Sequence, residues 1–128
     1  MNRSAIAAAA FALSIGAAGA ASAHHSTAMY DNTKLVEVKG VVKDFEPQNP
    51  HMDLYLVVTD GRGQHVLALE GQSVNNLYRL GYRRGMINVG DTITVAYNPL
   101  KTGVEGGFFQ SITIAGGKVL GLRPKPAS

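Results

Sequence analysis

Apolar side chains recur at every second position in several short segments of this chain, from residue 35 onward. In segment 35–45, valines alternate with charged residues. Segment 51–59 repeats the pattern and places four apolar residues on one face: Met52, Leu54, Leu56 and Val58. A period of two is typical of a half-buried β-strand, because successive side chains of a strand point to opposite faces. The alternation therefore predicts a protein built from short strands.

Turn signals separate these segments. Residues 46–50 contain two prolines, which have no amide hydrogen to give to a strand ladder. Asp60-Gly61 and Gly116-Gly117 favour tight hairpin turns. Gly40, inside the first segment, favours a bulge or a sharp coil of that strand. The predicted strands are 35–45, 51–59, 64–69, 92–97, 108–114 and 118–122, with Phe108, Gln110, Ile112 and Ile114 expected to share one face of the fifth.

One segment has the period of a helix. Ser73 can cap it, Val74, Leu77 and Tyr78 form one apolar stripe, and Gly81 favours its end. Three strands, a short helix and two or three further strands are the order of an OB-type barrel, in which the helix closes one end. We expect an all-β fold with one short helix, as a small OB-like barrel of five to six strands, with an open sandwich as the alternative.

The start of the chain has the three parts of a secretory signal peptide. Arg3 gives the basic region, residues 5–18 form an apolar run too short and too rich in Ala and Gly for a membrane span, and residues 21–23 read Ala-Ser-Ala. Cleavage is expected after Ala23, with Ala21 as the alternative. The predicted organisation is a cleavable signal peptide at 1–23, an N-terminal arm at 24–34, one β-barrel domain at 35–122 and a flexible tail at 123–128. The protein is therefore expected in the bacterial periplasm or secreted, with no membrane span after cleavage.

Composition limits the partners of the exported protein. Removing 23 of the 128 residues leaves 105, enough for one small domain. The chain contains no cysteine, so packing or a bound ligand must hold the fold. Losing Arg3 from the 12 basic residues leaves 11 against 9 acidic ones. This balance does not indicate a nucleic-acid partner.

Histidines are the candidate functional residues. Cleavage after Ala23 would make His24 the first residue, and its free amine and imidazole could then chelate one metal ion. A second imidazole would complete a three-nitrogen histidine brace, which favours copper. His51, directly after the Asn49-Pro50 turn, is the better candidate for that second ring, with His25 as a helper. Cleavage after Ala21 would instead place His24 third, where it can bind copper(II) through the amine and intervening amides. The predicted metal site is His24, His25 and His51.

Other residues near this site have weaker patterns. Met29 and Met52 are possible soft ligands, although the alternation of Met52 with two leucines favours a place in the core. Asp53 is a candidate acceptor for a hydrogen bond from His51. His65 is interpreted as a surface residue.

Catalytic patterns are not found. No serine lies in a nucleophile-elbow motif, and no helix follows a glycine-rich loop to cradle phosphate. The sequence therefore favours a binding protein over an enzyme. The alternative to copper binding is a metal-free module for a small molecule, glycan or peptide. Its ligand groove would lie on a barrel face and be lined by tyrosines: Tyr30, Tyr55, Tyr78, Tyr82 and Tyr97.

Several short motifs occur together in a recognisable order. They are His24-His25-Ser26, Met29-Tyr30-Asp31, Lys39-Gly40-Val41-Val42, Asn49-Pro50-His51, residues 90–95 (Gly-Asp-Thr-Ile-Thr-Val) and residues 98–103 (Asn-Pro-Leu-Lys-Thr-Gly). In this order they resemble the small exported bacterial proteins of the domain of unknown function 6152 family. The resemblance implies export and a compact β domain, with a shared role for His24, His25 and His51. The family often has tryptophans around the Asn-Pro-His turn, whereas here Pro47 and Met52 stand nearby and the chain has no Trp.

Overall fold

The structure is a computed structural model that describes residues 28–121 of the chain. The predicted signal peptide, His24, His25 and the tail 123–128 lie outside the described residues. The elements are β1 (Val36–Glu46), β2 (Asp53–Asp60), β3 (Gly63–Glu70), α2 (Val74–Arg79), β4 (Thr92–Pro99), β5 (Gly107–Thr113) and β6 (Val119–Gly121).

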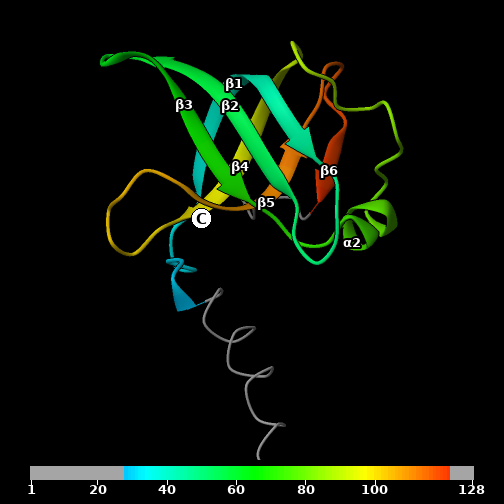
Figure 1. Cartoon of the computed structure of the whole chain (residues 1–128), viewed down its shortest axis with the longest axis horizontal. Helices are drawn as coiled ribbons and strands as arrows, with labels where there is room; N and C mark the ends of the chain where they lie inside the picture. Colours follow the sequence, from blue (N-terminus) through cyan, green and yellow to red (C-terminus); the bar gives the residue numbers. More distant parts are fainter. Residues whose placement is uncertain (1–27, 122–128) are drawn as a thin grey trace, which may run out of the picture.

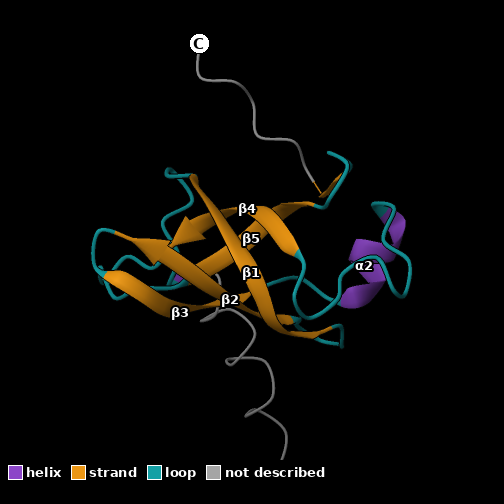
Figure 2. Cartoon of the chain, turned by 90° about the horizontal axis from the view of Figure 1, so that it is seen from above, coloured by secondary structure: helices purple, strands orange, loops and turns teal. Residues whose placement is uncertain are grey.

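The strands form a closed barrel (Figures 1 and 2). Hydrogen bonding gives the order β3-β2-β1-β4-β5-β6, and a parallel pairing of β3 with β5 closes the first five strands. The last strand, β6, extends the sheet beside β5. The nearly all-β OB-like barrel with one short helix is confirmed, and because the sheet closes on itself the open sandwich is wrong.

β1 is shared between both halves of the barrel. Residues 36–41 pair with β4, whereas residues 41–46 pair with β2. Gly40 lies near the changeover, and a Cβ there would come within 2.9 Å of the carbonyl oxygen of Val57. The glycine is therefore needed for the close approach of β2, and the irregularity in register comes later, between Val42 and Asp44.

The core fills the barrel, and α2 closes one end. The predicted inner face of β2 is confirmed, because Met52, Leu54, Leu56 and Val58 are all buried. Ser73 caps α2 by accepting a hydrogen bond from the Asn76 backbone N–H, and the buried Val74 and Leu77 join the same core. Figure 2 shows the helix beyond one end of the strands. Tyr78, the third residue of the predicted stripe, is exposed.

β5 contains a bulge that the alternation did not predict. Ala96 pairs with Ser111, but the next residue of β4, Tyr97, pairs with Phe109, so Gln110 is the extra residue. A bulge reverses the faces of the residues on one side of it. Phe109 therefore joins Ile112 in the core, whereas Phe108 and Gln110 lie outside it. The prediction that Phe108, Gln110 and Ile112 share a face is wrong for this reason.

Over residues 28–121, no helix has the length and apolar character needed to cross a bilayer.

Candidate functional site

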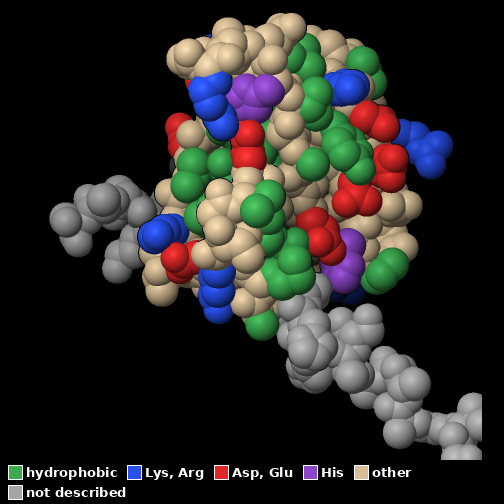
Figure 3. Space-filling model, turned by 60° about the vertical axis from the view of Figure 1, so that its left-hand side comes forward, with side chains coloured by type: hydrophobic (Ala, Val, Ile, Leu, Met, Phe, Trp, Pro, Cys, Tyr) green, Lys and Arg blue, Asp and Glu red, His purple; other side chains and the backbone are tan. Residues whose placement is uncertain are grey.

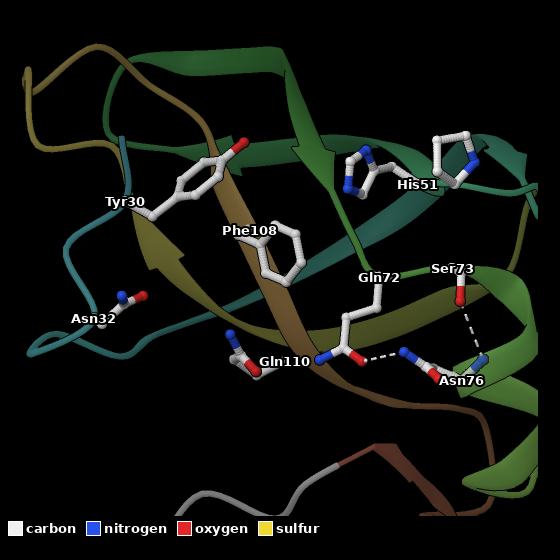
Figure 4. A pocket seen from close by; sticks show the side chains of 9 residues that line it. Tyr30, Asn32, His51, Gln72, Ser73, Asn76, Phe108 and Gln110 are labelled. Atoms are coloured by element: carbon white, nitrogen blue, oxygen red, sulfur yellow. Dashed lines mark hydrogen bonds between the residues drawn. The ribbon is translucent and has the colours of Figure 1, made fainter. Parts of the chain in front are cut away.

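A pocket of about 440 Å³ lies between the arm, the turn before β2, the segment leading into α2, and β5. Figure 4 shows its lining side chains. These residues are Tyr30, Asn32, Pro50, His51, Gln72, Ser73, Asn76, Phe108 and Gln110. The volume is in the range of small-molecule sites. The pocket combines a histidine, two aromatic rings and four carboxamides.

Glu70, at the end of β3, holds two of the lining side chains. The Tyr30 hydroxyl donates a hydrogen bond to Glu70 Oε2 at 2.7 Å. His51 Nδ1 lies 3.2 Å from Glu70 Oε1. One carboxylate therefore fixes the arm with one oxygen and orients the imidazole with the other, which leaves His51 Nε2 for a ligand.

Tyr30 connects the arm to the barrel. It is only 6% exposed, and it forms an isolated β-bridge with Leu100. The backbone N–H of Asp31 donates to the Pro99 carbonyl at 2.8 Å, and that of Lys101 donates to Met29 at 2.9 Å. Burial, and then the hydrogen bond to the Glu70 carboxylate, raise the pKa of the Tyr30 phenol above its ordinary value. Tyr30 therefore stays protonated and remains a donor.

The predicted metal ligands are placed only in part. His51 lies in the pocket, two residues before β2 begins at Asp53, and the Asn49–Pro50 peptide bond just before it is cis. His24 and His25 fall outside the described residues. Within residues 28–121, no group of three or more His, Cys, Asp or Glu side chains is arranged to hold a metal ion.

The neighbours of His51 differ from those expected. Its carboxylate partner is Glu70, which pairs across the sheet with Asp53, the residue that we expected in that role.

Met52 is buried in the core, as its alternation with leucines indicated, while Met29 is exposed on the arm. Of the five tyrosines, Tyr30 lines the pocket. Tyr78 and Tyr82 instead pack against each other with ring centroids 5.3 Å apart.

A second charged cluster joins the β2–β3 hairpin to the loop before β5. His65 Nε2 lies 2.6 Å from Glu105 Oε1, and Arg62 contacts Glu105 at 3.2 Å and Asp60 at 2.9 Å. His65 is therefore hydrogen-bonded into a charged network, which its interpretation as a surface residue did not anticipate. Figure 3 shows both described histidines on one face of the molecule, each beside acidic side chains.

The charges of this cluster shift its pKa values. Hydrogen bonds from Arg62 hold the pKa of Asp60 below its ordinary range. Desolvation alone would raise the pKa of Glu105, but hydrogen bonds from His65 and Arg62 outweigh it and lower the value. The same carboxylates raise the pKa of Arg62. Asp60, Glu105 and Arg62 therefore stay ionised at neutral pH.

Sequence reasoning missed most of the polar residues of the pocket. Gln72, Asn76 and Gln110 belong to no motif, and they come from the segment before α2, from α2 and from β5. Glu70, which contacts two lining side chains from the end of β3, belongs to no motif either. The available signals were the polar residues that follow the third predicted strand and those around the Ser73 cap. These residues can be recognised as parts of one pocket only once the closed barrel brings them together.

The fold is that of a small OB-type β-barrel, with a pocket between its arm and its helix that is lined by several polar side chains. The chain belongs to the family of unknown function DUF6152, whose model matches residues 12–110. Comparison with curated proteins and with solved structures returned no match.

Proposed function

We propose that this is an exported bacterial protein that binds copper, with His51 as a ligand in the pocket and His24 and His25 supplying the other nitrogens. The observation that carries the proposal is the contact of His51 Nδ1 with Glu70. Imidazoles that bind metals commonly give their second ring nitrogen to a carboxylate, which fixes the ring orientation and makes the ligating nitrogen more basic. The contact of His51 with Glu70 supplies that arrangement and leaves His51 Nε2 for the metal.

The position of the arm supports the same proposal. His24 is six residues before Tyr30, a tether of at most about 20 Å at ~3.3 Å per residue. Tyr30 lines the same pocket as His51 and shares its carboxylate partner. A tether of this length from Tyr30 would allow the N-terminal histidines to reach the pocket that contains His51. Copper suits a set of nitrogen donors and stands highest among divalent first-row metals in affinity.

Copper titration of the exported protein tests the proposal. We expect His24→Ala and His51→Ala each to weaken copper(II) binding by at least about tenfold. Glu70→Gln should weaken it by about 10- to 100-fold, as is usual for groups that orient metal ligands. His65→Ala is the matched control, because His65 also pairs with a carboxylate but lies at the charged cluster. Equal affinity in the wild type and in His51→Ala would refute the assignment.

Intact mass of the exported protein tests the N-terminus independently. Cleavage after Ala23 gives a chain that starts at His24, as the brace requires. A mass that retains Ser22 and Ala23 would exclude the brace and leave the alternative site with His24 at the third position.

A further inference from the structure

On the side of the pocket formed by Gln72 and Gln110, neighbouring hydrogen bonds decide which amide atoms donate and which accept. The Lys34 carbonyl can only accept, so the Asn98 atom 2.7 Å from it is the amide nitrogen. Asn98 Oδ1 then faces Gln110, whose contact at 2.6 Å is therefore through Nε2. Asn98 is buried, which holds this relay in place. Gln110 Oε1 is left without a hydrogen bond among the described residues, as an acceptor in the pocket.

A second chain of hydrogen bonds orients the Gln72 amide the other way, so that its nitrogen rather than its oxygen is left for a ligand. The Arg79 guanidinium can only donate, so its contact at 3.1 Å is with Asn76 Oδ1. Asn76 Nδ2 then donates to Gln72 Oε1 at 3.1 Å. Gln72 Nε2 is left without a partner among the described residues, as a donor. Figure 4 shows the hydrogen bond between Asn76 and Gln72, and the Gln72 side chain extending towards Gln110.

This side of the pocket therefore offers one fixed donor, Gln72 Nε2, and one fixed acceptor, Gln110 Oε1, beside the Phe108 ring. Among the described residues that line this side of the pocket there is no Asp, Glu, Lys or Arg, which favours a neutral ligand here. A single trans peptide unit points its N–H and C=O in opposite directions, so a peptide needs two successive units to reach both groups. Hydroxyls both donate and accept, so adjacent hydroxyls satisfy the pair directly, and the C–H face of a sugar ring can pack on an aromatic ring.

We infer that Gln72 and Gln110 bind adjacent hydroxyl groups of a neutral carbohydrate, with Phe108 under the sugar ring. This inference goes beyond the copper proposal and rests on different residues. Arg79 is a positioning residue in this site, because it orients Gln72 through Asn76 and does not itself line the pocket.

Saturation-transfer NMR and calorimetry with glucose, N-acetylglucosamine, maltose and triglycine test the inference. A metal chelator in every sample keeps the result independent of copper. At least one of the saccharides should bind the full exported chain. Gln72→Leu and Gln110→Leu should each weaken that binding by about two- to tenfold, the range for one hydrogen bond. Gln64→Leu is the matched control, since Gln64 is exposed on β3 and lies outside the pocket.

The exposed end of the second relay provides a test that leaves the lining residues intact. Arg79→Met should weaken saccharide binding and Arg79→Lys should restore it, because lysine also only donates. If the substitutions acted only by lowering stability, binding would not be lost with methionine and restored with lysine. The inference is overturned if none of the three saccharides binds, if binding is unchanged in Gln72→Leu and Gln110→Leu, or if triglycine is the probe whose binding needs both glutamines.

Discussion

At the scale of single residues, Glu70 determines the geometry of the candidate metal ligand. It accepts from Tyr30 with one oxygen and pairs with His51 through the other. Asp53 lies opposite Glu70 in the sheet, so the register of β2 and β3 decides which carboxylate meets the histidine. The nearest carboxylate in sequence, Asp53, was therefore a reasonable expectation but the wrong partner.

Tyr30→Phe tests the connection of the arm at high pH. The pKa of Tyr30 is raised in the folded protein, first by burial and then by Glu70, so the unfolded chain loses the proton first. The stabilisation is complete below about pH 10, the ordinary tyrosine pKa, and is lost as the pH rises beyond it. We expect Tyr30→Phe to have a lower melting temperature than the wild type at pH 7. Above pH 10, the melting temperature of the variant should fall less steeply with pH. Thermal melts at a series of pH values measure both, and an unchanged slope would contradict the prediction.

At the scale of elements, the bulge in β5 delivers residues to the pocket. The extra residue, Gln110, turns Phe109 inward while Phe108 and Gln110 line the site. Gly71 then makes room for the inward ring, because a Cβ at Gly71 would overlap the Phe109 side chain. The same bulge thus shapes both the core and the site.

Gly71→Ala tests this close packing. Since the added methyl would collide with a buried ring, we expect destabilisation of about 1–3 kcal/mol, the usual cost of overpacking. Gly61→Ala is the control, because a Cβ at Gly61 has no atom within 4 Å. Urea unfolding compares the two variants. Equal stability of both would show that the Phe109 ring moves aside without lowering the free energy of unfolding.

The charged cluster links the β2–β3 hairpin to the β4–β5 loop, and its effect should depend on pH. Because the pKa values of Asp60 and Glu105 are lowered in the folded state, their stabilisation is present above the ordinary carboxyl pKa near 4. It is lost as the pH falls through the lowered values.

Glu105→Gln tests the contribution of this cluster. The variant should melt at a lower temperature than the wild type at pH 6, and the difference should shrink between pH 4 and pH 2. Glu37→Gln, at an exposed carboxylate of β1, serves as the control. A difference that stays constant over the whole pH range would contradict the electrostatic explanation.

At the scale of the whole molecule, the closed barrel holds the site without covalent cross-links. The sequence contains no cysteine, so stability rests on the packed interior and on the closing pair of β3 with β5. That pair lies beside the pocket, since β3 ends at Glu70 and β5 carries Phe108 and Gln110. The pairing that closes the barrel therefore also brings Glu70 next to the pocket residue Phe108.

Leu56→Ala tests how far the core carries the fold. Leu56 is fully buried on β2, so its truncation should cost about 2–5 kcal/mol of unfolding free energy. Val89→Ala, at a side chain that is 70% exposed, should stay within about 0.5 kcal/mol of the wild type. Chemical denaturation measures both, and a small loss for Leu56→Ala would indicate that the interior readily collapses around the cavity.

The sequence by itself determined the elements and their order. Alternation indicated the strands and the inner face of β2, while Ser73 and Gly81 marked the ends of the helix. These are local properties, because side-chain period, capping and turn formation depend on residues close together in the chain. His51 was likewise recognisable as a candidate from its place after a rigid turn.

Only the tertiary structure decided the closure of the barrel, the bulge at Gln110 and the contact of His51 with Glu70. Each joins residues distant in sequence or changes a register, and a shift of one residue reverses the face of every side chain beyond it. The amide relays that end at Gln72 and Gln110 depend on the same pairings. Local periodicity carries no information about which strands meet, and the site is built where they meet.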